Sequence, residues 1–333
     1  MANMDSSVIS LPDGDNLELL DSIAREFRQG FEELAESAER ELAGRSFIFS
    51  RYGKELYPYF EETDAAQVPG CIIPIKEGRP VASVDSTCVL VGQTTDGALY
   101  AARTAVGISR EGALRRFFRA GPILVYLSAS GMSGLRSDLS SAEMGMLLAD
   151  HTIAERVLRN IVEGRVVESL LSSERELIVV ADGSLKHPFG QRQSPLDAGA
   201  SGNCLIGFSK SSNLIVSEGA VASLSKAIGA SYHLLDGGLV KTVLAKFTTD
   251  GLVFRLDLAG LREPVEDALG RLLWNDSFSA GYPESLKAAH HLSVFSKAED
   301  QALKAFVTKK FRLRQLPTFT LRRIALGSFK GGA

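Results

Sequence analysis

The chain has 333 residues, 45% of them apolar and 23% charged, so it can bury one large core or two modest ones. Its formal net charge of −3 gives no overall attraction to polyanions, and any nucleic-acid contact must come from a local basic surface. Three cysteines, Cys71, Cys88 and Cys204, lack the number and spacing of a disulfide framework or a zinc site, which favours a reducing cytoplasm. We expect no secretion signal and no membrane segment.

The first 80 residues are predicted to form an N-terminal region that is helical and then extended. Apolar residues recur at helical spacing over 16–42, which predicts an amphipathic helix. Pro69, Pro74 and Pro80 disfavour a helix in the following stretch, because proline locks φ and lacks a backbone donor. We interpret this stretch as a connection into a main domain spanning 81–333.

The main domain begins with β-type runs and continues into a long helix. The runs lie at 81–84, 88–93, 98–107 and 123–127. Asp96 and Gly97 separate two of them, which is a strong hairpin signal. Residues 141–171 are rich in helix formers, and Ser140 or Ser141 is a possible cap.

The remaining segments predict strands alternating with helices. The apolar run 177–181 is too short for a helix and is expected to be a buried central strand. Further strands are expected at 204–208, 242–247 and 252–258. Helices are expected at 220–235, at 264–274 and from Pro283, followed by a basic tail. This order predicts a mixed α/β sheet with helical additions.

Two aspartates stand where strands are expected to end, Asp85 in VASVDST and Asp182 in IVVADGSL. A buried strand end disfavours a lone carboxylate, because its desolvation costs several kcal/mol unless a cation is near. Aspartates on adjacent strand ends can share one metal ion. The alternative is that each aspartate simply begins a turn.

The long helix offers two further acidic candidates, Glu163 and Glu168. Periodicity in mid-helix places Glu168 within the apolar stripe and Glu163 outside its edge. In the last turn the apolar face moves round toward Glu163. Either residue could equally be a solvated helix glutamate.

The segment GYPESLKAAHH combines a tyrosine and a histidine at the start of a helix. Pro283 suits the first turn, and His290 follows about two turns later, roughly on the side of Tyr282. Such a pair could position a phosphate, move a proton or ligate a metal. A packed aromatic and a surface histidine are the simpler explanation of each residue alone.

Basic residues gather near the C-terminus, where they suit phosphate contacts or form a solvated face. They are Lys309, Lys310, Arg312, Arg314, Arg322 and Arg323. Lys210 and Arg255 lie beside apolar strand residues and therefore need anionic partners, which could be the acidic cluster. Neither a phosphate loop nor a GxSxG elbow is present, which disfavours a nucleotide-hydrolysing motor and a serine hydrolase.

The fragments VASVDST, ELIVVADGSL, LIGFSK, VFRLDL and GYPESLKAAH, in that order, resemble the NurA nuclease family. The resemblance covers roughly residues 81–290. It implies an RNase H-like core with helical N- and C-terminal additions, a homodimer, and Mn²⁺- or Mg²⁺-dependent hydrolysis of DNA. The implied activity is of the 5′–3′ exonuclease and single-strand endonuclease type, in DNA end processing beside a HerA-like hexameric ATPase.

The resemblance also implies roles for individual residues. It implies that the metal ligands are Asp85, Asp182 and a helix glutamate, which Glu163 matches better than Glu168. It also implies that Tyr282 and His290 belong to the catalytic set, with His290 as a possible further ligand. The family's first motif usually reads Asp-Gly-Ser, whereas Ser86 follows Asp85 here. A backbone that needs positive φ at this point would be strained. Ser86 supports a rival hypothesis, a non-catalytic dimeric adaptor of a HerA-like ATPase. A metal-dependent phosphatase acting on small molecules is a third hypothesis.

Overall fold

The structure is a computed structural model that describes residues 62–63, 68–94, 96–133, 141–185, 202–210, 215–216, 218–236 and 238–312. The helix expected within 16–42 lies outside these residues, and so do the basic residues Arg314, Arg322 and Arg323. None of the described helices has the length and apolarity needed to cross a membrane.

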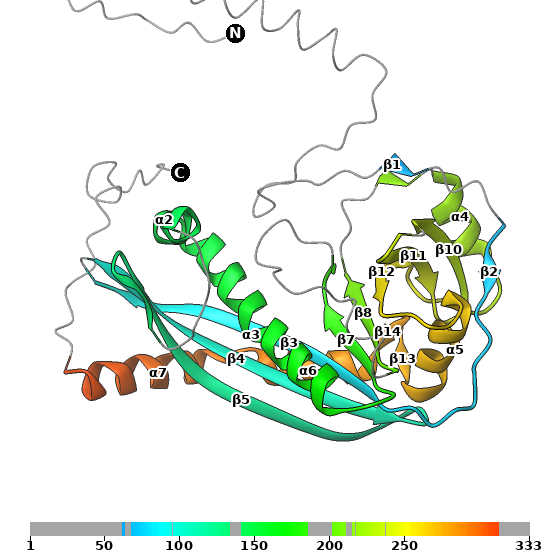
Figure 1. Cartoon of the computed structure of the whole chain (residues 1–333). Helices are drawn as coiled ribbons and strands as arrows, with labels where there is room; N and C mark the ends of the chain where they lie inside the picture. Colours follow the sequence, from blue (N-terminus) through cyan, green and yellow to red (C-terminus); the bar gives the residue numbers. More distant parts are fainter. Residues whose placement is uncertain are drawn as a thin grey trace, which may run out of the picture. The chain divides into compact units, whose positions relative to one another are not determined.

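A ten-stranded mixed sheet forms the centre of the described chain (Figure 1). In spatial order its strands are β2 (Gly70–Cys71), β10 (Ser231–Asp236), β11 (Lys241–Lys246), β12 (Phe254–Ala259), β8 (Cys204–Ser209), β7 (Ile178–Asp182), β3 (Val81–Gln93), β4 (Gly97–Arg110), β5 (Ala113–Ser128) and β6 (Gly131–Ser133). Two smaller pairs join β1 (Glu62–Thr63) to β9 (Ile215–Val216), and β13 (Phe278–Ser279) to β14 (Tyr282–Pro283).

Helices connect and cover these strands. They are α2 (Ser141–Ala149), α3 (His151–Ser173), α4 (Glu218–Lys226), α5 (Val265–Asn275), α6 (Glu284–Ser293) and α7 (Lys297–Lys310). The antiparallel meander β3-β4-β5 precedes α3, and the chain then returns as β7, parallel to β3, and as β8, parallel to β7. This connectivity is that of an RNase H-like mixed sheet, as the sequence resemblance implied.

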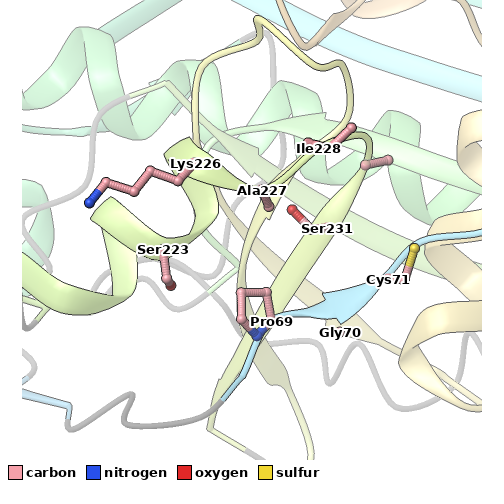
Figure 2. A pocket seen from close by; sticks show the side chains of 9 residues that line it. Pro69, Gly70, Cys71, Ser223, Lys226, Ala227, Ile228 and Ser231 are labelled. Carbon is pink, nitrogen blue, oxygen red and sulfur yellow. The ribbon is translucent and has the colours of Figure 1, made fainter.

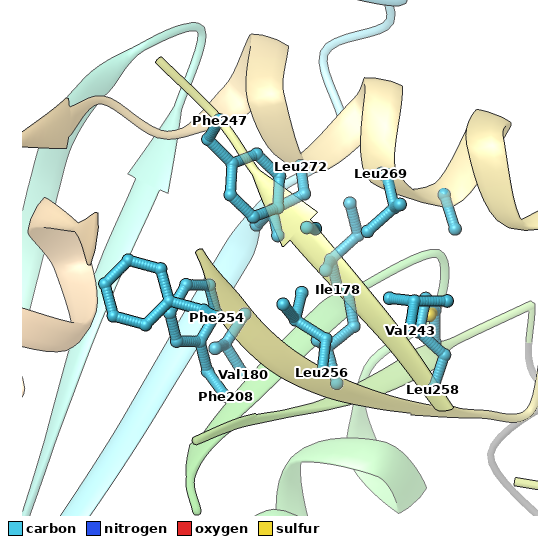
Figure 3. Close-up of a cluster of buried hydrophobic side chains, with 14 of the residues drawn as sticks. Ile178, Val180, Phe208, Val243, Phe247, Phe254, Leu256, Leu258, Leu269 and Leu272 are labelled. Atoms are coloured by element: carbon cyan, nitrogen blue, oxygen red, sulfur yellow. The ribbon is translucent and has the colours of Figure 1, made fainter. Parts of the chain in front are cut away.

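Alternating side chains of the central strands build two apolar layers, one on each face of the sheet. On one face Phe208, Phe254 and Leu256 pack against Leu269 and Leu272 of α5 (Figure 3). On the other face Val84, Val106 and Val179 lie under α3, which contributes Val167. Each fully buried side chain of this size contributes about 1.5–3 kcal/mol. The two layers therefore fix β3 and β7 between α3 and the C-terminal helices.

Several sequence predictions are confirmed, and others are wrong in detail. Strands β3 and β4 pair as the antiparallel hairpin predicted at this point, with Gly97 as the first residue of β4, and no helix interrupts 68–80. The runs 81–84 and 88–93 form one continuous strand. The helix predicted over 141–171 is broken at Asp150. The Asp150 side chain accepts hydrogen bonds from the backbone N–H groups of Thr152 at 2.8 Å and Ile153 at 3.3 Å, and so caps α3.

Two C-terminal expectations need correction. The helix predicted over 220–235 ends at Lys226, and 231–235 belong to β10, where pairing with β11 overrides local helix propensity. The predicted basic tail is in part α7, which begins with a capping box at Ser296 and ends with Lys309 and Lys310 in its last turn. The boundary at residue 80 between the N-terminal region and the main domain stays a prediction. Strand β2 precedes this position in the sequence and already pairs with β10 of the main sheet.

Candidate metal centre

Asp85 lies within β3, at the point where its neighbour β7 ends. The parallel register pairs Val84 with Ala181, and the next residues along the two strands are Asp85 and Asp182. Asp85 does not end its strand, contrary to the sequence expectation, because β3 continues beside β4 to Gln93. Its side chain is almost fully buried, 4% exposed, against 18% for Asp182. The sheet therefore brings two carboxylates together where β3 loses its β7 partner.

Helix α6 supplies the groups that contact Asp85. The carboxylate oxygen Oδ2 lies 2.8 Å from His290 Nδ1 and accepts a hydrogen bond from Ser293 Oγ at 2.9 Å. Nearer the start of α6, Ser285 Oγ lies 2.5 Å from Ser83 Oγ of β3. Alternate residues of β3 thus hold one face of α6 and place the His290 ring, which is half exposed, against Asp85.

Asp182 ends β7 and begins a tight turn. Gly183 has φ of +114°, a conformation that favours glycine, and its carbonyl passes so close to β8 that a Cβ on Gly207 would lie 2.6 Å from it. Lys210 Nζ donates to Asp182 Oδ2 at 2.9 Å and lies 5.3 Å from the centre of the Tyr282 ring. Lys210, singled out in the sequence, does contact the acidic cluster.

Asp257 on β12 holds the chain that follows Asp182. Its fully buried carboxylate accepts hydrogen bonds from Ser184 Oγ at 2.5 Å and from the Leu185 backbone N–H at 3.0 Å, both through Oδ2. The other oxygen, Oδ1, accepts from Thr242 Oγ1 at 2.9 Å and from Arg255 Nε at 3.2 Å. Arg255 therefore pairs with Asp257 and not with the cluster, and Asp257 anchors the turn that carries Asp182.

Glu163 and Glu168 occupy different environments on α3. Glu163 is partly buried, and its pKa is raised well above the ordinary value by desolvation and by the negative charges of Asp85 and Asp182. The Arg159 charge and the Ser86 backbone N–H oppose this rise in pKa. Glu168 is exposed. Glu163 therefore feels the charges of both aspartates, but it is not one of the three residues, Asp85, Asp182 and His290, whose ligand atoms lie together. Glu168 lies on the solvent side of the helix.

Tyr282 completes the surroundings of the cluster from β14. Its ring packs edge-on against Phe208, with ring centres 5.3 Å apart, and lies 5.8 Å from Phe254. Within the described part of the chain its buried hydroxyl has no hydrogen-bond partner. Burial raises the pKa of this hydroxyl, and the charges of Asp182 and Asp85 add to the effect. The Tyr282 hydroxyl therefore keeps its proton at ordinary pH and can donate a hydrogen bond.

Ser86 does not cause the strain considered from the sequence. It continues β3 opposite Thr104 and has no positive φ. The left-handed conformation occurs instead at Gly183, after the other aspartate, where glycine is present. A serine after Asp85 is thus compatible with the backbone of this strand.

One oxygen or nitrogen each from Asp85, Asp182 and His290 lie within 4.8 Å of one another. Two carboxylates and an imidazole are ligands that suit a divalent cation. The pKa of Glu163 is raised first by desolvation and then by the negative charges of Asp85 and Asp182, and a cation at these aspartates would oppose the second effect. The residues present therefore fit a divalent metal ion.

Some contributors were not found from the sequence. Ser293 follows His290 by three residues and so shares its helix face, a spacing that could have indicated it. Asp257 was visible only as a polar residue in an apolar strand. No local spacing connects it to Ser184, which is distant in the sequence.

A cavity of about 340 Å³ lies elsewhere in the fold, between β2, α4 and β10 (Figure 2). Its lining includes Pro69, Cys71, Lys226 and Ser231. None of the acidic cluster residues lines it, so it is separate from the candidate metal centre.

Comparisons with known proteins return solved structures only. No protein-family model matches the chain, and no curated protein matches it significantly. The NurA nuclease from Sulfolobus solfataricus is 14% identical, with a TM-score of 0.44 over 75% of this chain and 89% of that one. The human endonuclease V catalytic domain is 16% identical, with a TM-score of 0.40 over 72% and 86%. A second NurA structure is 9% identical, with a TM-score of 0.38 over 77% and 92%.

Proposed function

We propose that the protein is a divalent-metal-dependent deoxyribonuclease. The observation that carries this proposal is the convergence of Asp85, Asp182 and His290 from β3, β7 and α6, with potential ligand atoms within 4.8 Å of one another. Such clusters are suited to phosphodiester hydrolysis, because the metal ion activates water and stabilises the charge that develops on the phosphate.

Each side chain has a role that its surroundings support. Asp85, Glu163, Asp182 and His290 would hold Mn²⁺ or Mg²⁺. With His290 Nδ1 directed at Asp85, its Nε2 is left to hold the metal or to move a proton. The protonated Tyr282 hydroxyl would donate to a phosphate oxygen.

Lys210 would stabilise the charge of Asp182 and, after metal binding, that of the phosphate.

The finer parts of the proposal rest on the sequence motifs. Through their resemblance to the NurA family, these motifs imply 5′–3′ exonuclease and single-strand endonuclease action in DNA end processing, a homodimer, and work beside a HerA-like hexameric ATPase. The free thiols of Cys71, Cys88 and Cys204 support a reducing, cytoplasmic location. Exposed Lys309, Lys310 and Arg312 at the end of α7 are candidate phosphate contacts.

The test is hydrolysis of end-labelled single-stranded and duplex DNA in Mn²⁺, in Mg²⁺ and in EDTA. We expect metal-dependent products from the wild type and a loss of at least 100-fold in Asp182→Asn and Glu163→Gln. Glu168→Gln is the matched control, since it makes the same change on the exposed side of the same helix. Equal activity in Glu163→Gln and Glu168→Gln would remove Glu163 from the site, and an inactive wild type would refute the nuclease.

The ion pair between Lys210 and Asp182 favours a second candidate, the non-catalytic dimeric adaptor. An ammonium group next to the aspartate provides a positive charge without any metal. An adaptor would bind its ATPase equally well with or without Mn²⁺ and would leave DNA intact. A small-molecule phosphatase would instead cleave nucleotide monoesters and not DNA.

A further inference from the structure

Strand β5 has an exposed stretch that packing does not explain. Its residues 114–122 are all exposed, although they alternate between the two faces of the sheet. On its outer side β5 pairs with β6 only at 126–128, so the edge of the exposed stretch is unpaired among the described residues. The stretch reads LRRFFRAGP and combines Arg115, Arg116 and Arg119 with the aromatic residues Phe117 and Phe118. The two phenylalanines are 62% and 46% exposed.

The register places part of this stretch on the face that carries the candidate metal centre. Arg119 pairs with Ala105 of β4, which pairs with Asp85 of β3, so these three residues form one row across the sheet. The backbones of Arg119 and Asp85 are therefore two strands apart, about 10 Å at the usual strand spacing, with the buried Ala105 between them. Phe117 belongs to the neighbouring row on the same face, while Arg116 and Phe118 point to the opposite face.

The charges in this stretch disfavour a second copy of the chain as its partner. If two β5 edges paired antiparallel about the Phe117–Phe118 bond, Arg116 of one copy would lie opposite Arg119 of the other. Like charges in direct cross-strand contact are destabilising, and arginines on an edge strand oppose such pairing. Glu111 lies 3.7 Å from Arg115, and Glu299 lies 3.6 Å from Arg119, but no described carboxylate pairs with Arg116. The stretch keeps a net positive charge on an acidic protein.

We propose that residues 115–119 of β5 bind single-stranded nucleic acid and guide the substrate strand toward the metal centre. Exposed aromatic rings allow unpaired bases to stack, and arginines between them contact the phosphates. A duplex hides its base faces, so the phenylalanines add affinity only for an unpaired strand. The inference rests on the proposed nuclease function, because it names the form of substrate that the same site receives.

The test measures binding separately from hydrolysis. Fluorescence anisotropy of a labelled 20-nucleotide oligothymidine with the full chain in EDTA gives the dissociation constant at several salt concentrations. We expect Phe117→Ala/Phe118→Ala to weaken binding about 10-fold with an unchanged salt dependence. Arg115→Gln/Arg116→Gln/Arg119→Gln should weaken binding at least as much and lower the slope of log K against log salt by about 2.

The matched control changes three exposed arginines elsewhere, Arg156→Gln/Arg165→Gln/Arg175→Gln, with the same loss of charge. Equal weakening in this control, or unchanged binding in both β5 variants, would overturn the inference. So would β5 variants that change only the oligomeric state, which would make the edge a protein interface. Normal β5-dependent binding by a wild type that does not hydrolyse DNA would refute the nuclease and leave the binding surface standing.

Discussion

Asp257 accepts the backbone N–H of Leu185 at 3.0 Å, and this hydrogen bond ties the turn after Asp182 to β12, which is separated from β7 by β8. The Ser184 hydroxyl donates to the same carboxylate oxygen at 2.5 Å. Because both donors lie within three residues of Asp182, the position of Asp182 depends on a residue that does not itself reach the cluster.

Removing the Ser184 hydroxyl should loosen this turn. We expect Ser184→Ala to lower the free energy of unfolding by about 1.5–3 kcal/mol, the usual worth of a hydrogen bond to a charged group. Mn²⁺ affinity, measured by calorimetry on the folded variant, should fall with it. Thr242→Val is the control, because it removes a contact to the other oxygen of Asp257, away from the turn. If Ser184→Ala loses stability but keeps wild-type Mn²⁺ affinity, Asp257 has only a structural role.

Gly207 should not tolerate a side chain. A Cβ there would lie 2.6 Å from the Gly183 carbonyl oxygen and 3.0 Å from the Leu185 nitrogen, so the turn after Asp182 must shift. We expect Gly207→Ala to destabilise the fold by about 1–3 kcal/mol and to lower DNA hydrolysis. Thermal unfolding and a hydrolysis assay on the folded fraction measure the two effects. Full activity per folded molecule would show that the turn can move without harm.

Tyr282→Phe should separate stability from activity. The Tyr282 hydroxyl is buried without a partner among the described residues, so its removal relieves a desolvation cost. We expect the variant to unfold at the same or a slightly higher temperature and to hydrolyse DNA about 100-fold more slowly, because a donor to the phosphate is lost. Unchanged hydrolysis would make Tyr282 only a packing residue beside Phe208 and Phe254.

Asp276, which accepts hydrogen bonds from Ser285 at the start of α6, should make stability depend on pH. Burial raises the pKa of its carboxyl from 3.8 to about 6, although hydrogen bonds from Ser285 and Ser277 partly oppose this rise. Because the folded state binds this proton more tightly than the unfolded chain, the proton stabilises the fold. The stabilisation is complete below the unfolded pKa of 3.8 and is lost as pH rises through the folded pKa of about 6. The free energy of unfolding changes by about 3 kcal/mol between these limits.

Urea unfolding should therefore show the wild type gaining stability relative to Asp276→Asn between pH 7.5 and pH 4.5. The exposed Asp250→Asn is the control. A constant difference between wild type and Asp276→Asn over this range would contradict the raised pKa.

The sequence carried the fold class and the place of most strands, because apolar periodicity and the Asp96–Gly97 turn are local signals. It failed where long-range pairing decides the outcome, as at 231–235, which join β10 through β11. Asp85 was expected to end a strand, since nothing local shows that β3 outlasts β7. The choice between Glu163 and Glu168 depended on how α3 lies on the sheet, which helix periodicity alone leaves open.

Anomalous diffraction from crystals grown with Mn²⁺ would show directly whether the two aspartates hold a metal ion. We predict a manganese peak within ligand distance, about 2.0–2.3 Å, of carboxylate oxygens from both Asp85 and Asp182. Asp182→Asn crystals prepared in the same way should lack it. A wild-type crystal soaked in excess Mn²⁺ with no peak between these two aspartates, and with Lys210 still on Asp182, would contradict the proposed metal centre.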